Sequence, residues 1–290
     1  MTRLGANRYG KAEVRVVHVS RGAGPGGADA IRDWNVSTSL SGDLDATHLT
    51  GDNAAVLPTD TQKNTVYAFA RRLGGVEPEA LALELAAHYL ATQPPVSRAR
   101  VAVTEYPWLP VEAGDGRSFA RSGQYTRTAT VVADRERGTA VTGGIADLIV
   151  LNTAGSEFWG FARDEYTTLA DAHDRILATE VSARWRLRRP EADWAAVFTA
   201  ARAALLAAFT RPSKSLQQTL YGIGGAVLDA VPDVCEVRLV LPNKHHFLVD
   251  LEPFGLANDN EVYYAADRPY GLIEGAVLAD DAPDAGLAWD

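Results

Sequence analysis

The stretch Glu180-Val181-Ser182-Ala183-Arg184-Trp185-Arg186-Leu187 alternates apolar and polar side chains and precedes two long helical segments. A period of two predicts a strand with one buried face. The helices are expected at 191–209 and 213–230, and Pro232 ends the second one. Another strand is predicted at 234–241. This order predicts an antiparallel sheet with two helices packed on one face.

The first half of the chain shows the same order of signals. Strands are predicted at 13–20 and 31–40, helices at 61–71 and 78–90, and strands at 100–105 and 125–133. In the second half, further strands are expected at 146–151, 247–251 and 261–265. The predicted fold class is therefore α+β, with two tandem ββααββ modules and antiparallel sheets.

We place the boundary between the modules near Gly138, which gives modules at 1–137 and 138–278. The remaining residues, 279–290, are small and acidic and are expected to form a loosely held tail. An open four-stranded sheet has exposed edges that must be paired or covered. Closure into a barrel through other subunits is one solution, and it predicts an oligomer.

The composition indicates a globular protein and excludes several classes of function. Hydrophobic residues make up 47 % of the chain and charged residues 22 %, which suffices for a buried core. The net charge of −9 argues against a nucleic-acid-binding protein. The sequence contains no stretch typical of a membrane span, a signal peptide or a peroxisomal ending, so we expect a cytoplasmic protein without membrane contact.

Three patterns that often mark cofactors or metals have simpler explanations. The glycine-rich stretch 22–27 matches G-x-G-x-x-G, but the next residues alternate like a strand, which predicts a hairpin loop. His245 and His246 are adjacent, so in a strand they point to opposite faces and cannot easily share a metal. The single cysteine, Cys235, cannot form an internal disulfide and is expected to be a small buried side chain.

Three polar segments lie where a rigid framework could present them to a ligand. The run 241–247 directly follows a strand and is either a solvated loop or a functional segment. Thr59 and Gln62 form a capping box, with Thr59 as N-cap, and such a helix start also favours anions. Lys11 is either a surface charge or, beside a polar partner in a buried setting, a base.

Six blocks of the sequence together resemble the urate oxidase (uricase) family. They follow the family's order, and the resemblance covers nearly the whole chain, from Tyr9 to the Gly271-Leu272-Ile273 segment near the end, whereas the region 74–124 is least typical. The resemblance implies the tunnelling fold, in which two ββααββ modules per chain form dimers that close a barrel, and two barrels stack as a homotetramer. The blocks are Asn7-Arg8-Tyr9-Gly10-Lys11, Thr59-Asp60-Thr61-Gln62-Lys63-Asn64-Thr65, Gly155-Ser156-Glu157-Phe158-Trp159-Gly160-Phe161, Arg163-Asp164-Glu165-Tyr166-Thr167-Thr168-Leu169, Asp174-Arg175-Ile176-Leu177-Ala178-Thr179 and Leu241-Pro242-Asn243-Lys244-His245.

The resemblance also implies a binding site for the purine ring of urate. Phe158 matches the family's stacking aromatic residue, and Arg175 matches the arginine that grips one edge of the ring. Gln217 matches the glutamine at the opposite edge, and Leu216 is expected to contribute its backbone amide. The neighbouring Gln218 leaves the register of that match less secure.

The catalytic residues implied by the resemblance are Lys11, Thr59 and His245, acting as a proton relay. Thr59 and Asn243 are expected to hold oxygen above the ring, and Asp60 to place the purine through its backbone amide. The implied reaction oxidises urate with O2 and water to 5-hydroxyisourate and H2O2, without a metal or organic cofactor.

In the family, residues equivalent to Lys11, Thr59 and Asp60 come from one subunit and the others from its neighbour, so a monomer is expected to be inactive. One local departure from the family's pattern is Pro58, at a position where the resemblance leads us to expect a small or branched residue. Proline restricts Leu57 to extended conformations and suits a helix start, so it should be tolerated.

Two alternative functions use the same fold. A zinc-dependent pterin or purine enzyme would need histidine or cysteine ligands, which the sequence does not offer at ligand spacing. A non-catalytic purine-binding scaffold would fit a decayed site, whereas the residues that match the family's relay and clamp are intact. A metal assay and the consumption of urate in air would separate these alternatives.

Overall fold

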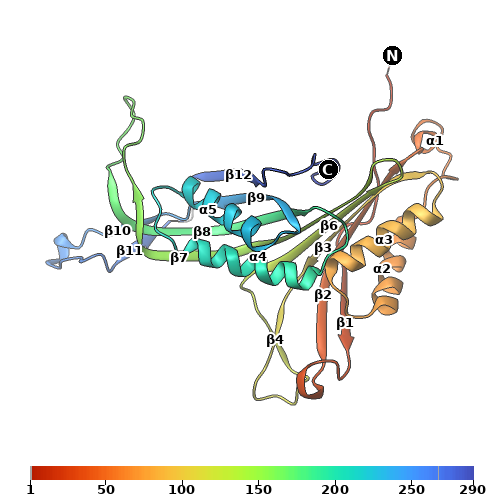
Figure 1. The fold of residues 1–290 in the computed structure, drawn as a ribbon, viewed down its shortest axis with the longest axis horizontal. Helices are drawn as coiled ribbons and strands as arrows, with labels where there is room; N and C mark the ends of the chain where they lie inside the picture. The colour runs from red at the N-terminus through yellow and green to blue at the C-terminus, as the bar shows by residue number, and fades with distance from the viewer. Residues whose placement is uncertain (1, 267) are drawn as a thin grey trace.

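A computed structural model describes residues 2–266 and 268–290. Its central feature is an eight-stranded antiparallel sheet with the order β1-β2-β3-β6-β7-β8-β9-β12 (Figure 1). The strands are β1 (Val14–Ser20), β2 (Ala30–Gly42), β3 (Val96–Glu105), β6 (Thr126–Asp134), β7 (Gly138–Phe158), β8 (Ala172–Leu187), β9 (Val234–Pro242) and β12 (Leu272–Leu278).

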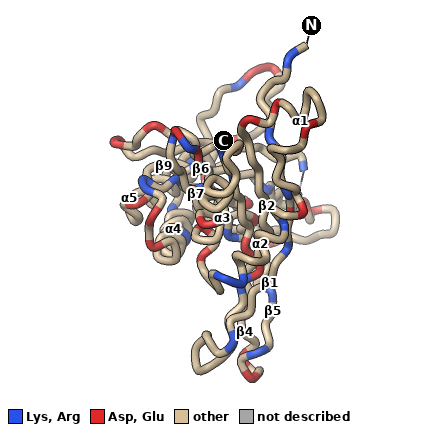
Figure 2. Tube along the Cα trace, turned by 90° about the vertical axis from the view of Figure 1, so that its right-hand side faces the viewer, with Lys and Arg blue, Asp and Glu red and all other residues tan. Residues whose placement is uncertain are grey.

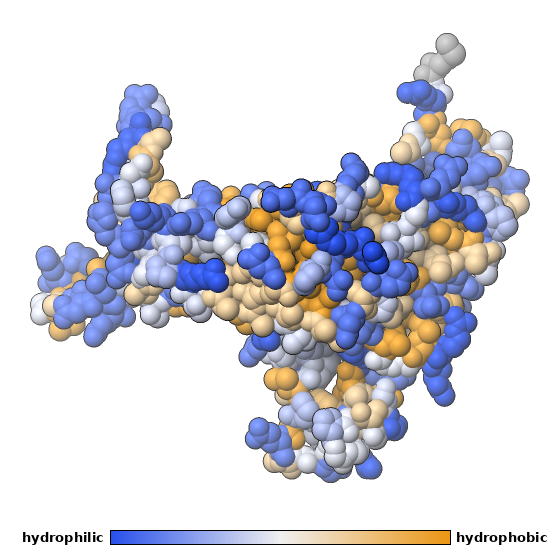
Figure 3. All heavy atoms as spheres, viewed as in Figure 1, coloured by the Kyte–Doolittle hydropathy of each residue, from blue (hydrophilic) through white to orange (hydrophobic). Residues whose placement is uncertain are grey.

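Four long helices lie on one face of this sheet (Figure 1). They are α2 (Thr59–Leu73), α3 (Pro78–Thr92), α4 (Trp194–Phe209) and α5 (Leu216–Ala230), and a short helix, α1 (Asp45–Leu49), precedes them. The core between the two layers is centred on large buried side chains such as Trp34, Leu85, Trp185 and Leu205. Mildly apolar residues also gather over the outer surface of α4 (Figure 3), in keeping with its alanine-rich sequence.

The ββααββ order occurs twice, which confirms the predicted fold class. The first set is β1, β2, α2, α3, β3 and β6, and the second is β7, β8, α4, α5, β9 and β12. The two sets are joined through β6 and β7, which pair antiparallel from Thr126 opposite Ala146 to Asp134 opposite Gly138. The glycine-rich stretch 22–27 lies in the β1–β2 connection, as expected for a hairpin loop.

The prediction of the last sheet strands was wrong. Residues 247–251 and 261–265 were expected to join the main sheet, but β10 (His246–Leu248) and β11 (Tyr263–Ala265) form a separate two-stranded hairpin. The strand that pairs with β9 is β12, from Leu272 opposite Pro242 to Leu278 opposite Glu236. As an edge strand β12 buries only Val277, so its sequence carries little of the alternation that marks a half-buried strand. A similar small hairpin is formed by β4 (Trp108–Pro110) and β5 (Phe119–Arg121).

The tail, 279–290, is docked onto the sheet, in contrast to the loose tail expected from its composition. The guanidinium group of Arg186 donates to the carbonyl oxygens of Pro283 at 2.7 Å and Asp284 at 3.1 Å. Leu287 is 3 % exposed, and the Trp289 ring centroid lies 4.0 Å from the guanidinium carbon of Arg238. Arginine side chains on the sheet face opposite the helices therefore bind carbonyl groups and an aromatic ring of the tail.

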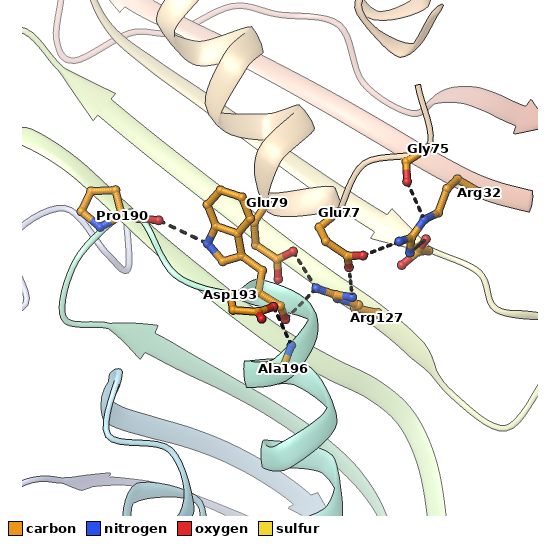
Figure 4. Close-up of polar contacts among 10 residues, drawn as sticks. Arg32, Gly75, Glu77, Glu79, Arg127, Pro190, Asp193 and Ala196 are labelled. Atoms are coloured by element: carbon orange, nitrogen blue, oxygen red, sulfur yellow. Dashed lines mark hydrogen bonds and ion pairs between the residues drawn. The ribbon is translucent and has the colours of Figure 1, made fainter. Parts of the chain in front are cut away.

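A largely buried cluster of charged side chains connects the two halves of the molecule (Figure 4). Arg127 of β6 is 5 % exposed and donates to Glu79 at 2.8 Å and to Glu77, both at the start of α3. It also donates to the carbonyl oxygen of Trp194, the first residue of α4, at 3.1 Å. One guanidinium group thus ties a strand and a helix of the first half to a helix of the second half.

Arg32 of β2 extends this cluster, because it pairs with Glu77 and, at 2.8 Å, with Glu105. Three carboxylates therefore face two guanidinium groups. Gly143 of β7 allows the close packing around Glu79, since a Cβ there would lie 3.2 Å from Glu79 Oε1 and 2.6 Å from Trp185 Nε1. Elsewhere along the chain, basic and acidic residues are interspersed in the view of Figure 2.

The buried carboxyl group of Glu79 is expected to make the stability of the protein depend on pH. Burial raises the pKa of Glu79 from 4.5 to about 7, so the folded state binds this proton more tightly than the unfolded chain. The resulting contribution to stability is complete below pH 4.5 and is lost as the pH rises through about 7. Glu79→Gln cannot ionise and should flatten the pH dependence of the free energy of unfolding in this range, measured by urea denaturation. A variant that keeps the wild-type slope would contradict this assignment.

Two smaller expectations from the sequence can also be compared with the structure. Cys235 is buried and not in a disulfide, as expected. Among the helices of the described residues, none combines the length and the apolar character needed to cross a membrane.

Candidate active site

A cavity of about 460 Å³ lies where the ends of β7 and β9 and the start of β8 meet the first turn of α5. The framework fixes this place, because strands and a helix from the whole second half converge on it. The structure brings together here all the site residues that were predicted in the second half: Phe158, Arg175, Leu216, Gln217, Asn243 and His245.

Phe158 and Arg175 form one wall of the cavity. Phe158 is the last residue of β7, and its ring stacks on Phe161 with 5.0 Å between centroids and an interplanar angle of 11°. The guanidinium carbon of Arg175 lies 5.2 Å from the centroid of the Phe158 ring. Burial lowers the pKa of Arg175, and its Nε has no hydrogen-bond partner among residues 2–266 and 268–290. A desolvated cation with unused donors beside an aromatic ring suits a flat anion.

The start of α5 supplies another wall. Ser215 is the N-cap, and its side chain accepts a hydrogen bond from the backbone amide of Gln218 at 3.1 Å. The side chain of Gln218 accepts from the amide of Lys214 at 2.7 Å, so this residue is used in the helix start. Gln217, and not Gln218, therefore lines the cavity. The first amides of a helix have no partner within it, so those of Leu216 and Gln217 are suited to bind a ligand.

Asn243 and His245 lie in the segment that follows β9, which neighbouring chain segments hold on both sides. The amide of Asn243 donates to the carbonyl oxygen of Gly271, and that of Lys244 to the carbonyl oxygen of Ala178, both at 2.8 Å. Burial lowers the pKa of His245, and the positive charges of Arg175 and His246 lower it further. A neutral imidazole beside the cavity can accept a proton at neutral pH.

Thr59 and Asp60 lie elsewhere, at the start of α2, and Lys11 lies near them in the segment before β1. Figure 1 shows α2 and the β10–β11 hairpin, which follows the cavity segment, at opposite ends of the sheet. The carboxylate of Asp60 is paired with Lys63, which lowers the pKa of Asp60, and the charge of Lys11 contributes to the same shift. The structure thus gathers the predicted residues into two groups, and one chain does not bring the groups together.

The segment that carries Lys11 is held against β2 by close backbone packing. A Cβ at Gly10 would lie 1.8 Å from the carbonyl oxygen of Thr38, so only glycine allows this approach. Thr38 exchanges backbone and side-chain hydrogen bonds with Lys11 and donates its hydroxyl hydrogen to Gln62 of α2 at 2.7 Å. This chain of contacts positions Lys11 relative to the start of α2.

The capping box predicted for Thr59 and Gln62 was wrong. Pro58 is the N-cap of α2, and Thr59 is its first helical residue. Gln62 is fully buried and donates to the carbonyl oxygen of Leu57 at 3.3 Å instead of reaching back to an N-cap threonine. Thr59 is exposed at the helix start.

Comparison with known proteins places this arrangement in a family. The family model described as Uricase matches residues 7–132 and 141–274. The chain belongs to the uricase family. The match includes the region 74–124, which resembled the family least, and between its two matched stretches it leaves out only the short interval 133–140 around the turn between β6 and β7.

Individual uricases agree with this assignment. The uricase of Arthrobacter globiformis is 49 % identical over 276 residues, which cover 94 % of this chain and 89 % of that protein. The uricase of Dictyostelium discoideum is 37 % identical over 282 residues, covering 96 % of this chain and 98 % of that protein. The crystal structure of the Arthrobacter globiformis uricase has a TM-score of 0.92 at 47 % identity and covers 98 % of this chain and 97 % of that chain. As a member of the uricase family, the protein is an oxidoreductase of the urate oxidase class.

Apolar residues of the cavity were not assigned a role from the sequence. Leu169, Ile176, Phe247 and Ile273 all line it. Leu169, Ile176 and Ile273 lie in segments that resemble the uricase family, and this resemblance was the one signal in the sequence that could have pointed to them. Neither the spacing nor the type of these residues distinguishes them from core residues. Their convergence is visible only in the folded chain.

Proposed function

We propose that the protein catalyses the cofactor-independent oxidation of urate by O2 and water to 5-hydroxyisourate and H2O2, in purine degradation. The observation that carries this proposal is the half-buried Arg175, whose buried Nε is unpartnered among the described residues, beside the Phe158 ring and lining the same cavity as Gln217. Urate is a flat anion with donors and acceptors along its edges. An aromatic face, a guanidinium fork and an amide match these three properties.

In this proposal the two ends of the purine are held by different parts of the framework. Arg175 of β8 donates two parallel hydrogen bonds to one edge and offsets the negative charge. Gln217 and the backbone amide of Leu216, from the first turn of α5, bind the opposite edge. Phe158 covers one face of the ring, and the backbone amide of Asp60 completes the placement.

The chemical steps need a base and a place for oxygen. Lys11 takes the hydroxyl proton of Thr59, Thr59 takes a proton from urate, and His245 extends this relay. The urate anion supplies the two electrons that reduce O2 to H2O2, and water adds to the oxidised ring to give 5-hydroxyisourate. Thr59 and Asn243 hold O2 and later water above the ring. Because urate itself is the reductant, the proposed reaction requires no metal or organic cofactor.

The relay and the clamp meet only if two subunits share a site. We propose that modules 1–137 and 138–278 of neighbouring subunits face each other, as implied by the tunnelling fold. The main sheet ends in β1 and β12, whose outer edges are unpaired within the described residues. Open edges of this kind are closed when sheets of several subunits form a barrel. The assembly expected from the family is a homotetramer, and the charge balance and the single reduced cysteine are compatible with the cytoplasm.

The function is tested by adding urate to the purified protein in air. We expect the ultraviolet absorbance of urate to fall and H2O2 to form, initially in a ratio of about one to one, with activity unchanged after treatment with a metal chelator. Binding of urate without its consumption would support a purine-binding scaffold instead. Loss of activity on chelation, restored by zinc, would support a metal-dependent enzyme of the same fold.

A further inference from the structure

Ser156 of β7 is a buried polar residue next to Arg175 to which no role has been given so far. It is 1 % exposed and stands directly opposite Arg175 of β8 in the antiparallel pairing. In the part of the chain that the structure describes, Ser156 Oγ and Arg175 Nε both lack a hydrogen-bond partner. A hydrogen-bond donor and an acceptor on facing residues are thus both buried and both without a partner. This arrangement costs free energy unless the two groups form hydrogen bonds when the substrate is bound.

The backbone around Ser156 also connects the two arms of the proposed purine clamp. The amide of Glu157 donates to the carbonyl oxygen of Ser213 at 2.8 Å, and the amide of Ser213 donates to that of Gly155 at 3.3 Å. Ser213 lies two residues before Ser215, the N-cap of α5, and α5 carries Gln217. Ser156 therefore lies between the strand that holds Arg175 and the segment that leads into the helix with Gln217.

The neighbouring hydroxyl group has a different, structural partner. Ser213 Oγ accepts a hydrogen bond from Thr219 Oγ1 at 2.8 Å, which joins the segment before α5 to its first turns. Ser156 and Ser213 are bridged through their backbones, yet only the hydroxyl of Ser213 has a partner of its own within the described residues. The free hydroxyl group of Ser156 is thus not explained by the local packing.

We propose that Ser156 is a positioning residue for Arg175, an inference that rests on the proposed oxidation of urate. When the purine anion occupies the cavity, Ser156 Oγ accepts a hydrogen bond from Arg175 Nε. This bond fixes the rotation of the guanidinium plane and directs the two terminal nitrogens toward one edge of the substrate. Facing residues of regular antiparallel strands hold their Cβ atoms about 4.5–5.5 Å apart, which is within reach of a long side chain such as arginine. The Ser156–Arg175 pair keeps this pairing although the β7–β8 register shifts on both sides of it.

The chemistry of the guanidinium group explains why this contact should affect binding more than turnover. The five N–H groups of arginine lie in one plane and form edges that can each bind a substrate. One kind of edge includes Nε, and the other is formed by the two terminal nitrogens. When Arg175 Nε donates to Ser156, the edge formed by the two terminal nitrogens is the one that binds the purine. The relay residues Lys11, in the segment before β1, and Thr59, at the start of α2, do not line the cavity of the same chain and are unaffected by this selection.

The test is Ser156→Ala compared with Ser213→Ala as the matched control. We expect Ser156→Ala to raise the KM for urate about tenfold, the usual effect of losing a hydrogen bond to a charged group, with little change in kcat. The Kd for urate without oxygen, measured by difference absorbance, should rise by the same factor. Ser156→Thr, which keeps the hydroxyl and suits a strand, should restore most of the affinity. Ser213→Ala should lower the Tm and leave KM unchanged.

A double-substitution cycle separates positioning from general damage. In an Arg175→Ala background, adding Ser156→Ala should cause no further loss of urate affinity, because its effect acts through Arg175. If the two substitutions caused additive losses of urate affinity, the positioning role of Ser156 would be overturned. An unchanged KM for urate in Ser156→Ala, with the wild-type enzyme active, would also overturn this role and would leave the proposed function intact. Wild-type protein that neither binds nor oxidises urate would overturn the proposed function, and the positioning role with it.

Discussion

Subunits carrying Lys11→Met and subunits carrying Arg175→Ala should each be nearly inactive alone and regain urate oxidation when they assemble together. Lys11→Met removes the proposed base, so turnover should fall by about 10²- to 10⁴-fold while urate still binds. Arg175→Ala removes the charge and the fork that hold the purine, so binding itself should weaken strongly. Because Arg175 lines the cavity of the second half of the chain and Lys11 belongs to the first half, a mixed pair of subunits can build one intact site.

The size of this recovery follows from statistics. With random assembly of equal amounts, about a quarter of the sites combine an intact relay from one subunit with an intact clamp from the other. The measurement is the urate oxidation rate of doubly tagged hybrids isolated after co-expression, with a mixture of the separately purified variants as control. Hybrids that contain both chains but stay inactive would show that each site lies within one subunit.

Arg127→Met should destabilise the fold by about 3–5 kcal/mol, the usual cost of removing one partner from a buried ion pair. Arg127 is 5 % exposed, and its loss removes the side-chain donor to Glu79, one of the two guanidinium partners of Glu77 and a donor to the Trp194 carbonyl oxygen. Methionine fills similar space without satisfying any of these groups. The effect is read from chemical denaturation at neutral pH, as the change in the free energy of unfolding.

An exposed ion pair provides the control for this prediction. Arg163 and Asp171 are joined at 3.0 Å, but their side chains are 50 % and 46 % exposed. Arg163→Met should therefore change the free energy of unfolding by less than about 1 kcal/mol. Equal effects of the two substitutions would mean that burial of the Arg127 cluster contributes nothing beyond an ordinary surface pair.

The sequence predicted most elements of the fold because their patterns are local. The alternation at 180–187 and the alanine- and leucine-rich segments before and after it place strands and helices without knowledge of the tertiary structure. β12 escaped prediction because an edge strand has little to bury, and the docked tail because its partners, such as Arg186, are far away in the sequence. The capping box failed for a local reason, since Pro58 occupies the N-cap.

The candidate site was predicted through resemblance to the uricase family rather than through residue patterns. Arg175 and Gln217 are ordinary polar residues in the sequence, and only the structure shows that they line the same cavity. Ser156 lay within a recognised block but carried no signal of its own. Its significance depends on being buried, unpartnered within the described residues and opposite Arg175, and these are properties of the folded chain.

The continuous pairing of β6 with β7 has a consequence for how the molecule can be divided. Although the pattern of elements repeats, the halves are not interchangeable parts. A fragment cut near Gly138 would leave the full length of β6 or of β7 without its partner strand, and it would lose the bond from Arg127 to the Trp194 carbonyl oxygen. Such fragments would gain more by recombining with each other than by standing alone, so the duplicated architecture behaves as one cooperative unit.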